Sequence, residues 1–281
     1  VLAGGLLYLA VRGADLGAMG QALADGEWVW ALPFVGAGFL SVVVRAWRWG
    51  LLIDALPETR GRVPLTLTTT SVFIGYLVNY AAPRLGEVVR TATVARRTEA
   101  TFAGVLGTVV AERVLDVAAL AVTLGGVAVL YGDRLAGIAA TFGASASERL
   151  QSLQGPWVWL AVVGLLFGLV AAGLWLRRHP KRGPLAALAA TFRDGLLSVV
   201  RTRRTPALLA STVALWACYA LMADFPLRLL GISQTYQLGL VDAWAVMAIG
   251  GIGMALPAPG GTGSFHYATV QALTLLFAVA V

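Results

Sequence analysis

Long apolar runs separated by short polar segments dominate this chain, and the pattern predicts helices that cross a membrane. An α-helix rises about 1.5 Å per residue, so about 20 apolar residues span the hydrocarbon core of a bilayer. The runs that approach or exceed this length, or that are cut short by a chain end, are 1–11, 28–50, 101–130, 157–176 and 206–230. Both chain ends read as lying inside helices, so we expect the natural protein to be longer.

Two further apolar runs, 63–82 and 238–256, are interrupted by proline and glycine. The loops before and after the first run are both predicted to be cytoplasmic, so the chain has to leave and return on one side. We therefore interpret 63–95 as a re-entrant hairpin broken at Pro83. The second run either re-enters in the same way or belongs to two crossings.

Composition supports a membrane protein and excludes a soluble one. Hydrophobic residues make up 58% of the chain and charged residues 12%, whereas a typical soluble domain carries about 25% charged residues. Tryptophans bracket the second predicted span, with Trp28 and Trp30 at one end and Trp47 and Trp49 at the other, as expected for aromatic belts. The single cysteine, Cys218, excludes an intrachain disulfide framework. The predicted fold is an all-α, polytopic membrane helix bundle, with 1–281 as a single transmembrane domain.

Basic residues in the loops orient this predicted bundle. The loop 177–204 carries eight lysines and arginines against one acidic residue, Asp194, so we expect it to be cytoplasmic. Counting spans backwards then places 12–27 and 131–156 outside and 51–62 inside. The expected location is the cell membrane, with several passes.

The same loop contains an apolar helical stripe. Residues at three- and four-residue steps share one face, and they are Leu185, Leu188, Phe192, Leu196 and Val199. This spacing predicts an interfacial helix on an anionic inner leaflet. The positive-inside bias of the loops accounts for most of the net charge of +7, so we expect no nucleic acid as a partner.

Charged residues inside a predicted span are candidates for function, because each costs about 2.5–3.5 kcal/mol at the bilayer centre on insertion scales. The sequence AERVLD, 111–116, places Glu112 and Asp116 on one helix face, with Arg113 within pairing distance. One interpretation is a buried ion pair that locks helices together, and the other is the wall of a polar cavity. In both, we expect Glu112 and Asp116 to face the interior of the bundle and at least one of the two carboxylates to contact Arg84, Arg90 or Arg113.

The first break carries the most specific pattern, NYAAPRLGEVVR. Pro83 ends one helix and Gly86 permits close approach of backbone or ligand near the start of the next. Unsatisfied N–H groups at a helix N-terminus, beside Arg84 and Arg90, favour an anion such as phosphate. Glu87 would orient both arginines, and Asn79 adds an amide. The alternative is a cytoplasmic hairpin whose arginines touch lipid headgroups.

The second break, PAPGGTGSFH, offers similar chemistry. Its backbone N–H groups predict a second anion cradle, formed by Gly260, Gly261, Thr262 and Gly263. His266 falls in the first turn of the next helix, where a structural role is the alternative to ligand binding. One Pro/Gly break in each half of the chain points to a transporter with broken helices and inverted halves. We expect the two breaks to lie within about 20 Å of each other, around one cavity.

These three motifs, NYAAPRLGEVVR, AERVLD and PAPGGTG, resemble the flippase-like family named for the transmembrane region of lysylphosphatidylglycerol synthase. The resemblance extends over essentially the whole chain. That family includes the membrane half of the multiple peptide resistance factor and stand-alone relatives. Its members often carry a glutamate three residues after the last glycine of the third motif, where this chain has His266.

The resemblance implies transbilayer movement of a lipid with a phosphate-bearing headgroup, such as an aminoacyl-phospholipid or a polyprenyl-phosphate-linked sugar of the cell envelope. We expect no enzymatic activity, no cofactor and no metal. Membrane lipids are the expected partners; a homo-oligomer and a lipid-synthesising enzyme as partner stay open. Two alternatives from other classes are an intramembrane lipid-modifying enzyme and a regulatory or scaffolding subunit of a lipid-synthesis complex.

Overall fold

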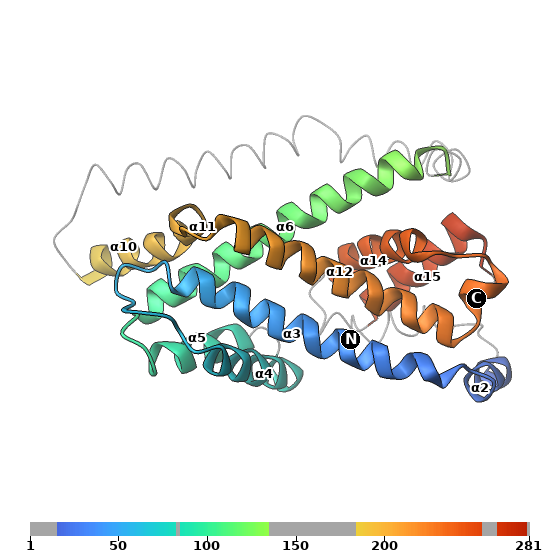
Figure 1. The fold of residues 1–281 in the computed structure, drawn as a ribbon, viewed down its shortest axis with the longest axis horizontal. Coiled ribbons are helices and arrows are strands. Elements are labelled where there is room, and N and C mark those ends of the chain that lie inside the picture. Colours follow the sequence, from blue (N-terminus) through green and yellow to red (C-terminus); the bar gives the residue numbers. More distant parts are fainter. Residues whose placement is uncertain (1–15, 83–84, 135–183, 255–262, 280–281) are drawn as a thin grey trace.

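The computed structural model describes residues 16–82, 85–134, 184–254 and 263–279, and these residues form helices and connecting loops without a β-strand (Figure 1). With the labels of Figure 1, the helices are α2 (Leu16–Ala24), the 3₁₀ turn η1 (Trp28–Trp30), α3 (Ala31–Ile53), α4 (Leu65–Ala81), α5 (Leu85–Ala95), α6 (Phe102–Leu130), α10 (Pro184–Leu196), α11 (Ser198–Arg201), α12 (Thr205–Leu229), α13 (Ile232–Thr235), α14 (Leu240–Met254) and α15 (Ser264–Phe277). The predicted all-α class is confirmed.

Three of these helical stretches are long and apolar enough to cross a membrane: Trp28–Ile53, Phe102–Leu130 and Thr205–Leu229. They coincide with three predicted spans, to within a few residues at the ends. The predicted spans 1–11 and 157–176 lie outside the described residues.

Helices α3 and α12 lie side by side and run in opposite directions (Figure 1). At one end, the backbone N–H of Glu27 donates to the carbonyl of Leu229 at 2.9 Å, and the rings of Trp30 and Phe225 stack at 5.9 Å. At the other end, Arg48 reaches Thr212. The two helices therefore form an antiparallel pair along most of their length.

Helix α6 crosses this pair obliquely and packs on the second half of α3 (Figure 1). Trp49 lies at this crossing, where it is fully buried and its indole N–H donates to the hydroxyl of Thr108 at 2.9 Å. The interpretation of Trp49 as part of an aromatic belt is therefore wrong. A helix neighbour covers this face of α3, whereas Trp47 on another face is exposed.

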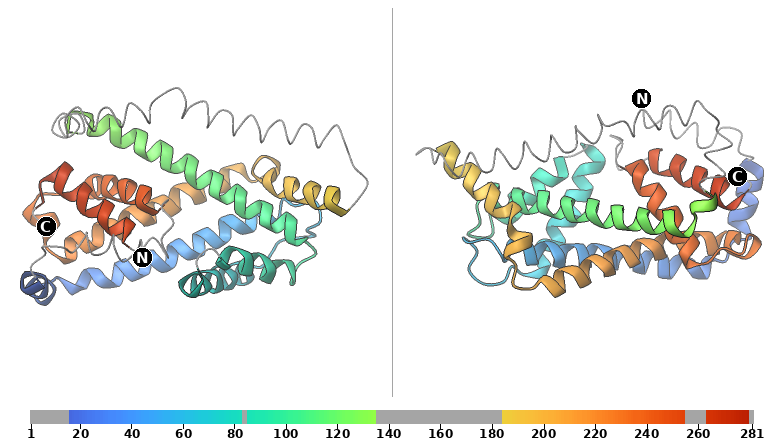
Figure 2. Two further views of the ribbon diagram at one scale, coloured as in Figure 1. Left: turned by 180° about the vertical axis from the view of Figure 1, so that it is seen from behind. Right: turned by 90° about the horizontal axis from the view of Figure 1, so that it is seen from above.

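Two helical hairpins, α4–α5 and α14–α15, complete the bundle. A Cβ placed on Gly86 would lie 2.0 Å from the carbonyl oxygen of Gly75, so α4 and α5 touch backbone to backbone. The other hairpin has the same kind of contact, since a Cβ on Gly253 would lie 2.4 Å from the carbonyl oxygen of Ser264. Both hairpins project to the same side of the α3–α12 pair (Figure 2, right).

The order of a long helix followed by a hairpin occurs twice among the described residues, as α3 with α4–α5 and as α12 with α14–α15. Because α3 and α12 are antiparallel, this order agrees with two inverted halves. Inverted halves and re-entry into the bilayer stay predictions.

The loops predicted to be cytoplasmic gather at one end of the bundle, around the start of α6. A Cβ on Gly104 would lie 3.6 Å from both the side chain of Leu56 and the carbonyl oxygen of Thr191. Helix α10 crosses α6 there through glycines: a Cβ on Gly195 would lie 2.1 Å from the carbonyl oxygen of Gly104. The predicted interfacial helix is thus also packed against α6, which its apolar stripe did not indicate.

Replacing Gly195 by alanine should loosen α10 from α6, because two backbones in contact leave no room for a methyl group. Overpacking of this kind costs about 1–3 kcal/mol. We expect faster tryptic cleavage at Arg201, Arg203 and Arg204, measured in detergent. Gly36→Ala is the matched control, since a Cβ at Gly36 meets no atom within 4 Å in the part of the chain that the structure describes. Equal cleavage rates of the two variants would contradict this packing.

Candidate functional site

A buried carboxylate, Glu112 of α6, lies at the centre of a network of arginines. Its Oε1 accepts from Arg45 of α3 at 2.5 Å, and its Oε2 accepts from Arg90 of α5 at 3.0 Å. Arg48, one turn further along α3, lies 3.5 Å from Oε1. Glu112 and Arg48 are fully buried, and Arg45 and Arg90 nearly so. The network therefore joins α3, α5 and α6 in the interior, as predicted for this carboxylate.

Asp116, one turn after Glu112, extends the network. Its Oδ1 accepts from Arg48 at 2.5 Å, and its Oδ2 lies 3.4 Å from Arg45. Arg45 also donates to the hydroxyl of Tyr219 on α12 at 2.6 Å. A fourth helix is thus tied to the same charges.

The network has an exposed side as well as a buried one. Arg113 donates to Glu87 of α5 at 3.1 Å, and the two side chains are 49% and 28% exposed. Arg113 also lies 3.8 Å from Asp116. Asp116 is the middle residue of the 29-residue helix α6, so this accessible ion pair sits near the midpoint of a helix long enough to span a bilayer.

Asn79 of α4 fixes the start of α5. Its Oδ1 accepts from the backbone N–H of Gly86 at 2.8 Å, and its Nδ2 lies 3.4 Å from Glu87. The prediction of a helix N-terminus with free N–H groups is therefore incomplete, because one of these donors is satisfied within the hairpin. Asn79 acts as the cap of α5 and as a support for Glu87.

The sequence motifs are only partly visible in the structure. Pro83 and Arg84 of the first break, and Gly260, Gly261 and Thr262 of the second, lie outside the described residues. Gly263 and His266 are described: the ring Nδ1 of His266 accepts from the backbone N–H of Gly263 at 3.4 Å. This bond closes the first turn of α15. Convergence of the two breaks stays a prediction.

Sequence reasoning missed Arg45, Arg48 and Tyr219. The signal was present as RAWRW, 45–49, which places two arginines three residues apart inside a predicted span. Glu112 and Asp116, four residues apart on another predicted span, are likewise separated by about one helical turn. We interpreted Trp47 and Trp49 as markers of the bilayer edge, and no role was predicted for Arg45 and Arg48.

The family model described as "Lysylphosphatidylglycerol synthase TM region" matches residues 1–281. The chain belongs to this family. No curated protein and no solved structure matches the chain. Membership in the lysylphosphatidylglycerol synthase TM-region family makes it a membrane protein with a role connected to lipids.

Within this family member, the first two resemblance motifs meet in space. Arg90 and Glu87 of the first motif pair with Glu112 and Arg113 of the second, respectively. Both pairs join α5 to α6, although the motifs are separated along the chain. The two motifs by which the chain resembles its family therefore meet at the contact between α5 and α6.

Proposed function

We propose that this protein moves a lipid with a phosphate-bearing headgroup across the bilayer, and that the exposed side of the network receives the headgroup. The observation that carries the proposal is the accessible pair of Arg113 and Glu87 near the middle of a membrane-long helix. A charge in contact with hydrocarbon there would be costly, so such residues line a water-filled or ligand-filled cavity.

The charge balance of the network favours an anionic headgroup. Four arginines face three carboxylates among the described residues: Arg45, Arg48, Arg90 and Arg113 against Glu87, Glu112 and Asp116. One positive charge is therefore in excess. Arginine binds phosphate through two parallel N–H donors, which suits the exposed guanidinium of Arg113.

The same contacts favour binding over catalysis. Every carboxylate of the network is bonded to an arginine, and His266 bonds to the backbone. A general acid or base has to exchange protons with a substrate, and these groups are already engaged. Transport of an intact lipid requires no such group.

The experiment is reconstitution into vesicles with labelled lipids, with Arg113→Gln as the decisive variant. We expect transbilayer movement of phosphate-bearing lipids by the wild type and at least a tenfold loss in the variant, the order expected when a charge-assisted hydrogen bond is removed. The melting temperature should change little, because pairs this exposed contribute about 0–1 kcal/mol.

Arg201→Gln is the matched control for this experiment. Arg201 forms a partly exposed pair with Asp194 at 2.9 Å, away from the network, so its loss should leave transport unchanged. Equal transport by the Arg113 variant and the wild type would reject the network as the headgroup site. Absence of movement for every lipid tested with the wild type would reject the transport function itself.

A further inference from the structure

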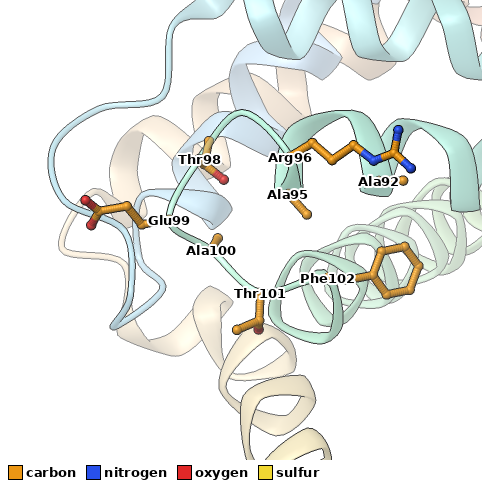
Figure 3. Close-up of a pocket in the computed structure, with 8 residues that line it drawn as sticks. All are labelled: Ala92, Ala95, Arg96, Thr98, Glu99, Ala100, Thr101 and Phe102. Atoms are coloured by element: carbon orange, nitrogen blue, oxygen red, sulfur yellow. The ribbon is translucent and has the colours of Figure 1, made fainter.

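A cavity of about 530 Å³ lies where α5 ends and α6 begins (Figure 3). Its lining residues are Ala92, Ala95, Arg96, Thr98, Glu99, Ala100, Thr101 and Phe102. The cavity is separate from the charge network, and it lies at the end of the bundle where the basic loops gather.

Within the described part of the chain, the cavity offers one cation without a protein counter-charge, Arg96. Arg96 forms no ion pair with another residue of the described chain. The carboxylate of Glu99 points away from the cavity (Figure 3) and lies 3.5 Å from Arg60. The hydroxyl oxygen of Thr101 accepts from the N–H of Gly104, which leaves its own hydrogen to donate. The polar wall therefore suits an anion.

Another part of the wall is apolar. The ring of Phe102 and the side chain of Arg96 lie on the same side of the cavity (Figure 3), and Phe102 is exposed. An arginine beside an exposed ring at the edge of a predicted span matches a ligand with a phosphate at one end and a hydrocarbon tail at the other. A free phosphate would use only the polar part.

The cavity also lies on the same seam as the exposed end of the network. Phe102, Val110 and Arg113 are spaced by eight and three residues on α6, which places them along one face of the helix. Arg113 pairs across the seam with Glu87 of α5. The seam between α5 and α6 thus leads from the cavity to the mid-helix charges.

We propose that this cavity binds the phosphate headgroup of a membrane lipid before the headgroup reaches the network. The role of the cavity as the place where a lipid enters rests on the proposed transport function. Lipid binding in the cavity can be tested without a transport assay. Arg96 contacts the phosphate, and Phe102 contacts the first part of the tail.

The test places the photo-cross-linker benzoylphenylalanine at Phe102 in the full chain, in vesicles that contain either radiolabelled phosphatidylglycerol or radiolabelled diacylglycerol. We expect strong labelling by phosphatidylglycerol and at least fivefold weaker labelling by diacylglycerol, which lacks the phosphate. Adding Arg96→Ala should reduce labelling by phosphatidylglycerol about tenfold, as for loss of a charge-assisted contact.

Two controls make the result specific. Arg97→Ala removes the neighbouring exposed arginine, which does not line the cavity, and should leave labelling unchanged. The same cross-linker at Val122, an exposed position further along α6, should be labelled by both lipids and be insensitive to Arg96→Ala. It also reports that the variant is folded and inserted.

The outcomes separate the entry site from the transport function. Equal labelling by the two lipids, or equal effects of Arg96→Ala and Arg97→Ala, would overturn the site. Protection of position 102 by soluble glycerol phosphate would assign the cavity to a free phosphate and overturn the lipid assignment. Labelling that depends on Arg96 without any lipid movement would support the site and reject transport. Lipid movement without labelling would overturn the site and leave transport standing.

Discussion

Replacing Glu112 by glutamine is expected to lower the free energy of unfolding by about 3–5 kcal/mol, the cost of removing one partner of a buried ion pair. The glutamine would leave the buried guanidinium groups of Arg45 and Arg90 without the charge that they contact at 2.5 and 3.0 Å. Asp116 offsets only part of the positive charge left on Arg45 and Arg90, because its closest arginine is Arg48. Thermal unfolding in detergent should shift down by about 10 °C.

Glu99→Gln is the matched control for charge removal. Glu99 pairs with Arg60 at the surface, and both side chains are exposed, so its loss should cost less than about 1 kcal/mol. Adding Arg90→Gln to Glu112→Gln should recover part of the lost stability, because it removes one uncompensated charge. Equal melting of the Glu112 and Glu99 variants would show that the network is solvated rather than buried.

Replacing Gly86 by alanine should be the most damaging change in the first hairpin. The added Cβ would lie 2.0 Å from the carbonyl oxygen of Gly75 and 2.6 Å from Oδ1 of Asn79. No side-chain rotation relieves contact with a backbone oxygen, so α5 has to move away from α4. That movement would displace Arg90 and Glu87 from their partners on α6, and we expect transport to be abolished.

Gly125→Ala on α6 provides the comparison, because a Cβ at Gly125 meets no atom of the described residues within 4 Å. Alanine is a better helix former than glycine by about 1 kcal/mol, so this variant should melt slightly higher than the wild type. Measured side by side, the two glycine variants should change stability in opposite directions. A Gly86 variant with wild-type stability and transport would contradict the hairpin contact.

The sequence predicted the parts of the fold that depend on local pattern. The apolar runs located α3, α6 and α12, and the break at Pro83 separated α4 from α5. The motifs also predicted an inward-facing Glu112 with an arginine partner, which Arg90 confirms. These features follow from periodicity and from the cost of unpaired charge in a membrane.

The remaining features depend on how the helices cross. Nothing within 28–53 shows that Arg45 and Arg48 face α6 rather than lipid headgroups, because both positions are compatible with the end of a span. Asn79 was recognised as polar, but its bond to the N–H of Gly86 exists only after the hairpin has closed. Likewise, Trp49 became a core residue because α6 covers it.

The attachment of Arg45 and Arg48 to a later helix constrains how this protein enters a membrane. Both arginines are synthesised more than sixty residues before Glu112, so α3 leaves the ribosome with two charges whose partners do not yet exist. At about 2.5–3.5 kcal/mol each near the bilayer centre, they favour a shallow position for α3 until α6 arrives. A chain ending before Phe102 should therefore hold α3 closer to the membrane surface on the side of the 51–62 loop than the full chain does, which glycosylation-distance mapping can measure. An identical depth in both chains would show that α3 takes its final place unaided.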